Sequence, residues 1–235
     1  MSYSQKELIE ERRAQRRKQR RLTILIFVLG AGLIISAALL LFSNTNQVDL
    51  TLSEIVRPDL EQPPMADGAA MGDPEAPVKI VDFSDFGCSH CADFALTTEK
   101  QLAEVYVASG EVYYEFRSVG ALLGAPATVQ AAEAAYCAGD QNAFYPFHDL
   151  IFANQRQLFI NIDADLAPTM VTFAQLLDLD IDQFSACLDS GKHSDRVAQD
   201  ELAARQAGVT GTPSFLVNGQ LLTGNQPFAN FQEII

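Results

Sequence analysis

Two cysteines, Cys88 and Cys91, stand three residues apart where an apolar, β-branched run gives way to a helical pattern. The first turn of a helix presents unpaired backbone N–H groups and the positive end of the helix dipole, and both stabilise a thiolate at Cys88. Cys91 follows one turn later on the same face, close enough to form a disulfide with Cys88. The spacing therefore predicts a redox pair that performs thiol–disulfide exchange.

Two neighbouring residues have side chains that could assist this pair. His90 lies between the cysteines, where an imidazolium would lower the pKa of Cys88 and make the disulfide more oxidising. Asp82 lies in the apolar run, six residues before Cys88, and a buried carboxylate there needs a partner. We predict that Asp82 accepts a proton from Cys91 through water, although strand alternation could instead place it on a solvated face.

The remaining cysteines, Cys137 and Cys187, bear on two alternative readings of the pair. A zinc site needs about four ligands, usually as two close pairs, and these two cysteines are 50 residues apart, so we expect no metal. A purely structural Cys88–Cys91 bridge would close a ring too small to restrain the unfolded chain much. Four cysteines outside the cytoplasm allow three pairings, and proximity leaves Cys137–Cys187 as the second disulfide, with two buried thiols as the alternative.

The elements around the redox pair follow from the residue pattern. Strand-like runs at 78–86 and 111–119 flank a helical stretch at 92–108, which fits a right-handed parallel βαβ unit. Residues 127–208 are mostly helical in pattern, with Ala, Leu and Phe at three- and four-residue steps. The Asn218-Gly219 pair then predicts a β-hairpin, and a closing helix follows near the end of the chain.

The N-terminal part reads as a membrane anchor. Leu22–Phe42 contains 21 residues without charge or proline, enough to span a bilayer as a helix. The preceding basic tail, residues 1–21, predicts a cytoplasmic N-terminus and an extracytoplasmic remainder. A cleaved signal peptide is the alternative, although the apolar run is long and ends in a poor cleavage site. We interpret residues 43–71 as a linker and residues 72–235 as the folded domain.

Charge is unevenly distributed along the chain. The formal net charge is −14, yet residues 1–21 hold eight of the sixteen Lys and Arg residues. The folded region is therefore strongly acidic, which argues against nucleic acid as a partner because phosphate binding requires clustered basic residues.

Residues 72–235 resemble the DsbA-like branch of the thioredoxin superfamily. The motifs that carry the resemblance are GDPEAPV at 72–78, FSDFGCSHC at 83–91, FHDLIF at 147–152 and GVTGTPSF at 208–215. The resemblance implies an α/β thioredoxin fold with a helical insertion at about 125–192 that borders a peptide-binding groove. It also implies a cis Pro213 beside the redox pair, backbone groups of Thr212 offered to an extended substrate strand, and a buried acid at Asp82.

The function we expect is an extracytoplasmic, membrane-anchored thiol–disulfide oxidoreductase without a cofactor that oxidises cysteines of exported proteins. The resemblance further implies a membrane quinone-linked partner that reoxidises the pair. Ser89 departs from the residue found in the best-known oxidases, and Thr212 occurs in both oxidases and isomerase-like relatives. A thiol reductase or disulfide isomerase on the same fold is therefore an alternative. An alternative of another class is a non-enzymatic tethered binding module or metal chaperone that uses Cys88, His90 and Cys91 as soft ligands.

Overall fold

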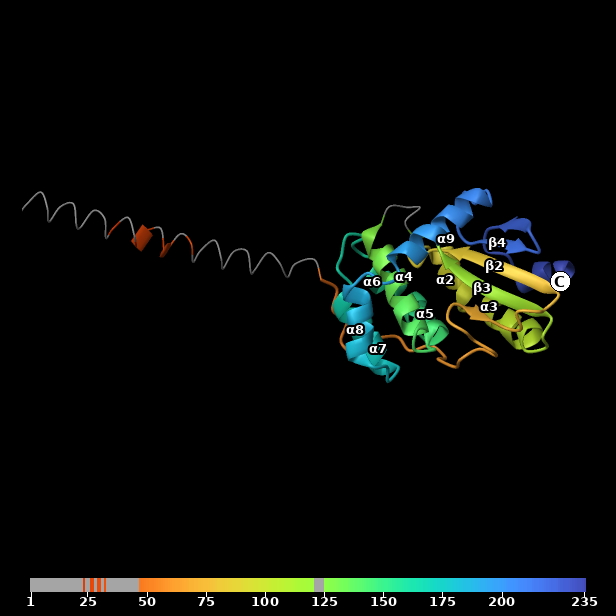
Figure 1. The fold of residues 1–235 in the computed structure, drawn as a ribbon, viewed down its shortest axis with the longest axis horizontal. Helices are drawn as coiled ribbons and strands as arrows, with labels where there is room; N and C mark the ends of the chain where they lie inside the picture. Colours follow the sequence, from red (N-terminus) through yellow and green to blue (C-terminus); the bar gives the residue numbers. More distant parts are fainter. Residues whose placement is uncertain (1–22, 24–25, 28, 31, 33–46, 121–124) are drawn as a thin grey trace, which may run out of the picture. The chain divides into compact units, whose positions relative to one another are not determined.

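The computed structural model describes residues 23, 26–27, 29–30, 32, 47–120 and 125–235, and it divides the chain into two units, 1–46 and 47–235 (Figure 1). The predicted basic tail and most of the predicted transmembrane segment Leu22–Phe42 lie outside these residues. The few described positions of the first unit are helical. Among the helices that can be described, none is long and apolar enough to cross a membrane.

The second unit is built around a five-stranded sheet with the strand order β1-β3-β2-β4-β5. Its central strands, β2 (Val78–Ser84) and β3 (Val112–Ser118), run parallel, as the predicted βαβ unit requires. The other pairings are antiparallel, and they add β1 (Ala70–Met71), β4 (Ser214–Val217) and β5 (Gln220–Thr223). The β4–β5 hairpin turns at Asn218 and Gly219, both with positive φ, which confirms the hairpin prediction.

Alternation along β2 gives the sheet two apolar faces. Ile80 belongs to the large core under α2 (Ser89–Ala95), α3 (Thr98–Leu102), the π-helical turn η1 (Ala103–Val107) and α10 (Phe228–Ile234). Phe83 belongs to a smaller cluster with Ala204 of α9 (Ser194–Gln206), which covers the opposite face (Figure 1). The predicted single helix at 92–108 is thus three consecutive helical pieces, interrupted at Leu96 and Thr97.

The predicted helical insertion is confirmed as a layer beside the sheet. The layer consists of α4 (Pro126–Gly139), α5 (Phe144–Ala153), α6 (Gln155–Leu158), α7 (Ala167–Leu176) and α8 (Ile181–Asp189). Cys137 of α4 and Cys187 of α8 form the predicted second disulfide, with their Cα atoms 5.9 Å apart. Both cysteines are buried, so this bond joins two helices inside the layer.

Residues 47–71 differ from the linker that the sequence predicts, because they pack along the folded unit. The Val48 N–H donates to the carbonyl of Asp165, and the Leu50 N–H donates to the Thr169 hydroxyl, both at 3.0 Å. Ile55 is buried in the core, and β1 at the end of the segment pairs with β3. Apolar side chains and paired backbone groups fix this stretch, so the folded unit begins at Gln47 rather than Gly72.

Candidate active site

The two redox cysteines lie at the head of α2, where the sequence predicts them. Cys88 is the N-cap residue with an extended backbone, and its side chain is half-buried. Cys91 sits one turn later and is fully buried. Both are free thiols in this structure, so the reduced form is the one observed. The arrangement exposes one sulfur to a partner and keeps the other behind it.

The surroundings of Cys88 stabilise its thiolate. The hydrogen bond from the Cys91 thiol contributes most and, against the opposing effect of burial, helps lower the pKa of Cys88 to about 5. The Thr212 side chain and the backbone N–H groups of Cys91 and His90 lower this pKa further. At pH 7 a thiol with this pKa is present as thiolate in roughly hundredfold excess.

Cys91 has the opposite character. Burial raises its pKa well above the ordinary value, and the hydrogen bond to Cys88 and the charges of Cys88 and Asp82 raise it further. A reduced Cys91 therefore keeps its proton at neutral pH while Cys88 loses its own. The chain thus pairs a half-buried nucleophile, Cys88, with a fully buried thiol, Cys91, that must be deprotonated before it can react.

The loop before β4 lies against the pair, as the resemblance implies. The Thr212–Pro213 peptide bond is cis. The carbonyl oxygen of Thr212 lies 3.4 Å from the Cys88 sulfur and accepts a hydrogen bond from the thiol form. The loop therefore sits beside the reactive atom, and binding of a substrate strand by Thr212 stays a prediction.

Asp82 lies inside the protein, not on the solvated face that strand alternation left open. Its side chain is 1% exposed, and it accepts hydrogen bonds from the Ser84 hydroxyl at 2.6 Å and the Tyr114 hydroxyl at 2.8 Å. Burial outweighs these hydrogen bonds and raises the pKa of Asp82 to about 7. A carboxyl group with that pKa can exchange a proton near neutral pH, which is consistent with the predicted role beside Cys91.

His90 acts on Cys88 through a different group from the one predicted. The contribution that the structure gives is a hydrogen bond from the His90 backbone N–H to Cys88. The His90 side chain is exposed to solvent. An effect of its imidazolium charge on the thiolate stays a prediction.

Two residues that the sequence did not single out hold the active-site loop. The buried Asp85 accepts a hydrogen bond from the Gly87 N–H at 2.8 Å, and its own N–H lies 3.5 Å from the Cys91 sulfur. The amide of Gln155 in α6 donates to the carbonyl oxygens of Phe86 at 2.7 Å and Cys88 at 2.8 Å. Asp85 lies near the end of the strand predicted at 78–86 and precedes the redox pair, so its position could have indicated a role in the active-site loop. No feature of the sequence indicates such a role for Gln155.

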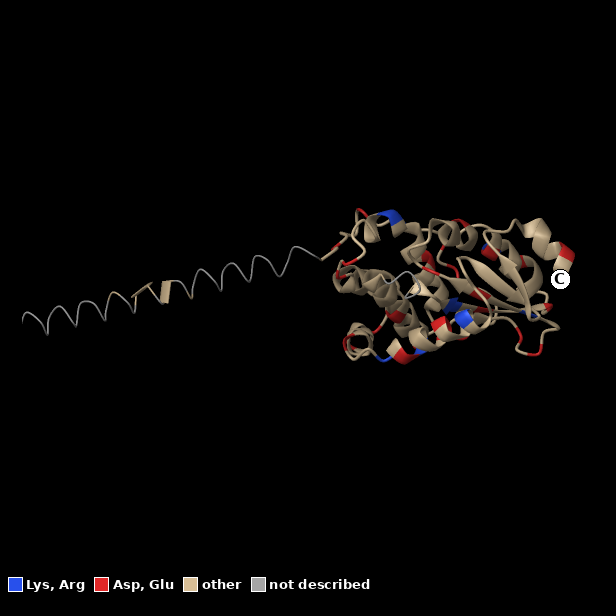
Figure 2. Ribbon diagram, turned by 90° about the horizontal axis from the view of Figure 1, so that it is seen from above, with Lys and Arg blue, Asp and Glu red and all other residues tan. Residues whose placement is uncertain are grey.

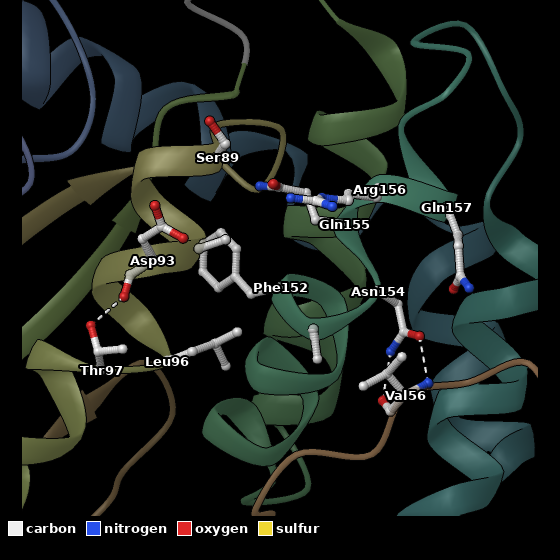
Figure 3. Close-up of a pocket in the computed structure, with 12 residues that line it drawn as sticks. Val56, Ser89, Asp93, Leu96, Thr97, Phe152, Asn154, Gln155, Arg156 and Gln157 are labelled. Atoms are coloured by element: carbon white, nitrogen blue, oxygen red, sulfur yellow. Dashed lines mark hydrogen bonds between the residues drawn. The ribbon is translucent and has the colours of Figure 1, made fainter.

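A cleft of about 350 Å³ opens between α2 and the helical layer and is lined in part by Ser89, the residue that follows Cys88. Figure 3 shows Ser89 and Asp93 of α2 on one side of the cleft, with Phe152, Gln155 and Arg156 on the other. The predicted helical insertion thus borders a concave surface at the start of α2. Binding of a peptide in this cleft is not tested by the structure.

Two groups of side chains within the described residues have the composition of a metal site. In the group of Cys137, Cys187 and His193, the two sulfurs are joined in a disulfide and are not thiolate ligands. In the buried group around His148, the Lys100 ammonium already pairs with Asp149 and supplies the positive charge. Neither group therefore suits a cation.

Comparison with known proteins places the chain in a family. The family model described as thioredoxin matches residues 65–235. A probable disulfide bond formation protein D of Bacillus cereus is 32% identical over 169 residues, which cover 71% of this chain and 76% of the relative. The crystal structure of Wolbachia pipientis alpha-DsbA1 superposes with a TM-score of 0.63 at 24% identity, covering 73% of this chain and 90% of that chain.

A further relative is much longer than this chain. The Na(+)/H(+) antiporter NhaA 3 of Salinispora tropica is 36% identical over 200 residues, which cover 84% of this chain. The chain spans 28% of the length of that antiporter and 21% of a second one, from Salinispora arenicola. The expected resemblance to DsbA-like proteins is confirmed by the Bacillus relative and the Wolbachia fold. The chain belongs to the thioredoxin family.

Proposed function

We propose that this protein is a thiol–disulfide oxidoreductase that oxidises cysteines of other proteins through a Cys88–Cys91 disulfide. The observation that carries the proposal is the contrast between the two thiols, because the pKa of Cys88 is about 5 whereas that of Cys91 is raised well above its ordinary value. Relatives named as disulfide bond formation proteins and protein-disulfide oxidoreductases support it.

The reaction transfers two electrons from the substrate to the protein. A substrate thiolate attacks the Cys88 sulfur, the Cys88–Cys91 bond breaks, and its electron pair leaves on Cys91, which takes a proton. A second substrate thiolate then attacks the substrate sulfur of the mixed disulfide and releases Cys88 as a thiolate. Of the two protons from the substrate thiols, one ends on Cys91 and the other in solvent.

The stability of the Cys88 thiolate favours oxidation over reduction or isomerisation. A thiolate with a low pKa is a good leaving group, so the second substrate thiol displaces Cys88 readily. The same stabilisation makes the reduced protein more stable relative to the disulfide form, which raises the reduction potential. Cys88, which is half-buried, lies next to the Thr212 loop and directly precedes Ser89 of the cleft, and this arrangement suits an extended segment of a substrate protein.

We place the reaction outside the cytoplasm, with the chain held in the cell membrane by a single N-terminal helix and its N-terminus inside. The apolar run 22–42 and its basic flank support this topology. The Cys137–Cys187 disulfide supports an oxidising compartment. Acidic residues are spread over the second unit (Figure 2), which suits exported proteins as substrates better than nucleic acid. A membrane quinone-linked protein is the proposed source of reoxidation.

The equilibrium of the full-length chain with glutathione tests the direction of the reaction. We expect a reduction potential for Cys88–Cys91 closer to the value of about −120 mV of a strong oxidant than to the value of about −270 mV of thioredoxin. A potential near the latter would contradict the oxidase and favour a reductase.

Variants of the two cysteines test the residue roles. We expect Cys88→Ser to abolish oxidation of a reduced, unfolded protein, and Cys91→Ser to accumulate mixed disulfides through Cys88. An absence of mixed disulfides in Cys91→Ser would contradict a substrate-facing role for Cys88. High-affinity zinc or copper binding without any oxidation activity would instead support the binding-module alternative.

A further inference from the structure

A set of polar side chains, with one gap of 3.9 Å between Glu99 and His148, extends from the neighbourhood of the redox pair into the core. It begins at Asp82, whose charge raises the pKa of Cys91 and whose own pKa is raised by the charge of Cys88. The Tyr114 hydroxyl lies 2.8 Å from Asp82 Oδ2 and 3.0 Å from Glu99 Oε2. A phenol has one hydrogen, so it can donate to only one of these carboxyl groups at a time and must accept from a proton on the other. Both carboxyl groups are buried, and this geometry requires them to share protons.

The set continues from Glu99 through a buried histidine. His148 Nε2 lies 3.9 Å from Glu99 Oε2, about 1 Å beyond hydrogen-bond length, and has no hydrogen-bond partner among the described residues. On the other side of the ring, Nδ1 lies 3.0 Å from Asp149 Oδ1. An imidazole can accept a proton at one nitrogen and release one from the other, so His148 can connect Glu99 with Asp149.

The far end of the set reaches solvent. Asp149 forms an ion pair with the ammonium of Lys100, whose side chain is 32% exposed. By contrast, His148 is fully buried. Aromatic rings surround its imidazole within 6 Å between centroids, and these are Phe86, Phe116, Phe144, Tyr145 and Phe152. Because these rings enclose the imidazole, its two nitrogens are the polar atoms that lie between Glu99 and Asp149.

We propose that Asp82, Tyr114, Glu99, His148, Asp149 and Lys100 form a proton relay that joins Cys91 to the surface at α3. The proposal rests on the proposed exchange at Cys88–Cys91. When the disulfide opens, Cys91 leaves as a thiolate and takes a proton from Asp82, which is replaced along the relay from solvent. When the pair is reoxidised by a disulfide partner, the Cys91 proton travels the same path outward. The Cys91 thiolate then attacks the Cys88 sulfur of the mixed disulfide, the bond between Cys88 and the partner breaks, and the partner leaves as a thiolate.

The protonation states of the buried groups are consistent with this direction of transfer. Burial raises the pKa of Glu99 well above its usual range and that of Asp82 to about 7, so both can hold protons near neutral pH. Burial also lowers the pKa of His148, which favours the neutral ring that a relay needs. Several ionisable groups face this path. They are Asp82 of β2, Asp85 after β2, Cys88 at the N-cap of α2, Cys91 of α2, Glu99 and Lys100 of α3, Tyr114 of β3, Tyr145, His148 and Asp149 of α5, and Asp59 before the sheet.

The test removes one hydroxyl from the relay and compares it with a matched hydroxyl outside it. Tyr114→Phe in the full-length chain breaks the link between Asp82 and Glu99 and keeps the ring. Tyr145→Phe is the control, because Tyr145 is an equally buried tyrosine of the same core whose hydroxyl donates to the Ala69 carbonyl at 3.1 Å. The reduced proteins are mixed with glutathione disulfide, and the release of glutathione by Cys91 is followed from pH 5 to 8. Alkylation of Cys88 is measured in parallel.

We expect Tyr114→Phe to slow the Cys91 step by roughly tenfold to a hundredfold and to change its pH profile, since proton transfer by a positioned group contributes on this scale. Cys88 alkylation should keep its rate, and Tyr145→Phe should match the parent in both measurements. Glu99→Gln, which keeps the shape but cannot pass a proton through a carboxyl group, should reproduce the slow step if Tyr114→Phe fails to fold.

Three outcomes would overturn the relay. The first is a Cys91 step in Tyr114→Phe or Glu99→Gln with the rate and pH profile of the parent, which would mean that Asp82 exchanges protons with solvent directly. The second is equal slowing in Tyr145→Phe, which would indicate a general packing effect. The third is a parent chain that does not exchange with glutathione at all; only this one also removes the proposed function.

Discussion

We expect the hydrogen bond from the Cys91 thiol to account for much of the lowered pKa of Cys88. Two substitutions of Cys91 separate this effect from the effect of the helix start. The hydrogen bond from Cys91 is the largest contribution that lowers the pKa of Cys88 to about 5. Cys91→Ala removes the donor, whereas Cys91→Ser replaces it with a hydroxyl donor at the same position. Both variants leave the backbone N–H groups of α2 and the Thr212 side chain in place.

The size of the effect follows from the strength of such a bond. A hydrogen bond to a charged group stabilises it by about 1.5–3 kcal/mol, and about 1.4 kcal/mol corresponds to one pKa unit. We therefore expect Cys91→Ala to raise the pKa of Cys88 by roughly one to two units, with Cys91→Ser close to the parent. At pH 6 the alanine variant should hold clearly less thiolate than the serine variant.

Alkylation with iodoacetamide measures this pKa directly. Only the thiolate reacts, and Cys137 and Cys187 are held in their disulfide, so the pH dependence of the rate reports Cys88 alone. Mass spectrometry confirms the modified residue. The same midpoint in Cys91→Ala and Cys91→Ser would refute the reasoning, because the helix start and Thr212 would then hold the thiolate without Cys91.

Three further predictions concern stability. Replacing Cys137 and Cys187 by Ala should lower the free energy of unfolding by about 4 kcal/mol in urea titrations, given their separation of 50 residues; a loss below about 1 kcal/mol would contradict the chain-entropy estimate. The pKa of Asp82 is about 7 in the folded protein against an ordinary value of 3.8, so between these pH values unfolding releases its proton and stability falls as pH rises. Asp82→Asn should remove that fall and be more stable than the parent well above pH 7 by roughly 4 kcal/mol, whereas equal curves for both proteins would count against a raised pKa. Gln155→Leu leaves the Phe86 carbonyl without its side-chain donor, whereas the Cys88 carbonyl still accepts from the Cys91 and Ala92 N–H groups, so the loss should be about 1–3 kcal/mol. The control Gln157→Leu, at a partly exposed site, should cost less; equal losses would show that the loop does not depend on Gln155.

Local sequence signals were sufficient for the parts of the fold that depend on neighbours in the chain. The strand 78–84, the cysteines at the head of α2 and the turn at Asn218-Gly219 each have their cause within a few residues. The Cys137–Cys187 disulfide could be predicted by elimination, because proximity assigns the other pair. The burial of Asp82 could not be predicted from the sequence, because period-two alternation does not indicate which face of β2 other elements cover.

Contacts between distant segments account for what the sequence did not reveal. Residues 47–71 read as a linker because prolines and polar residues interrupt any period, yet they bind helices that follow more than 80 residues later. The sequence analysis assigns no role to Tyr114 or His148, and only the packing of α3, α5 and β3 brings them to Glu99. Gln155 holds the active-site loop from a helix that no local pattern connects with Cys88.

Because the Cys137–Cys187 bond is buried, the protein contains one structural disulfide and one redox-active pair, Cys88–Cys91. Disulfide exchange requires an incoming thiolate to reach a sulfur atom, and both sulfurs of the structural disulfide lie within the helical layer. Burial therefore restricts the access of thiolates that react at Cys88 to these two sulfurs, which protects the scaffold from disulfide exchange. The newly made chain must first obtain this bond from an external oxidant, which makes the protein a recipient of the same chemistry before it becomes a donor.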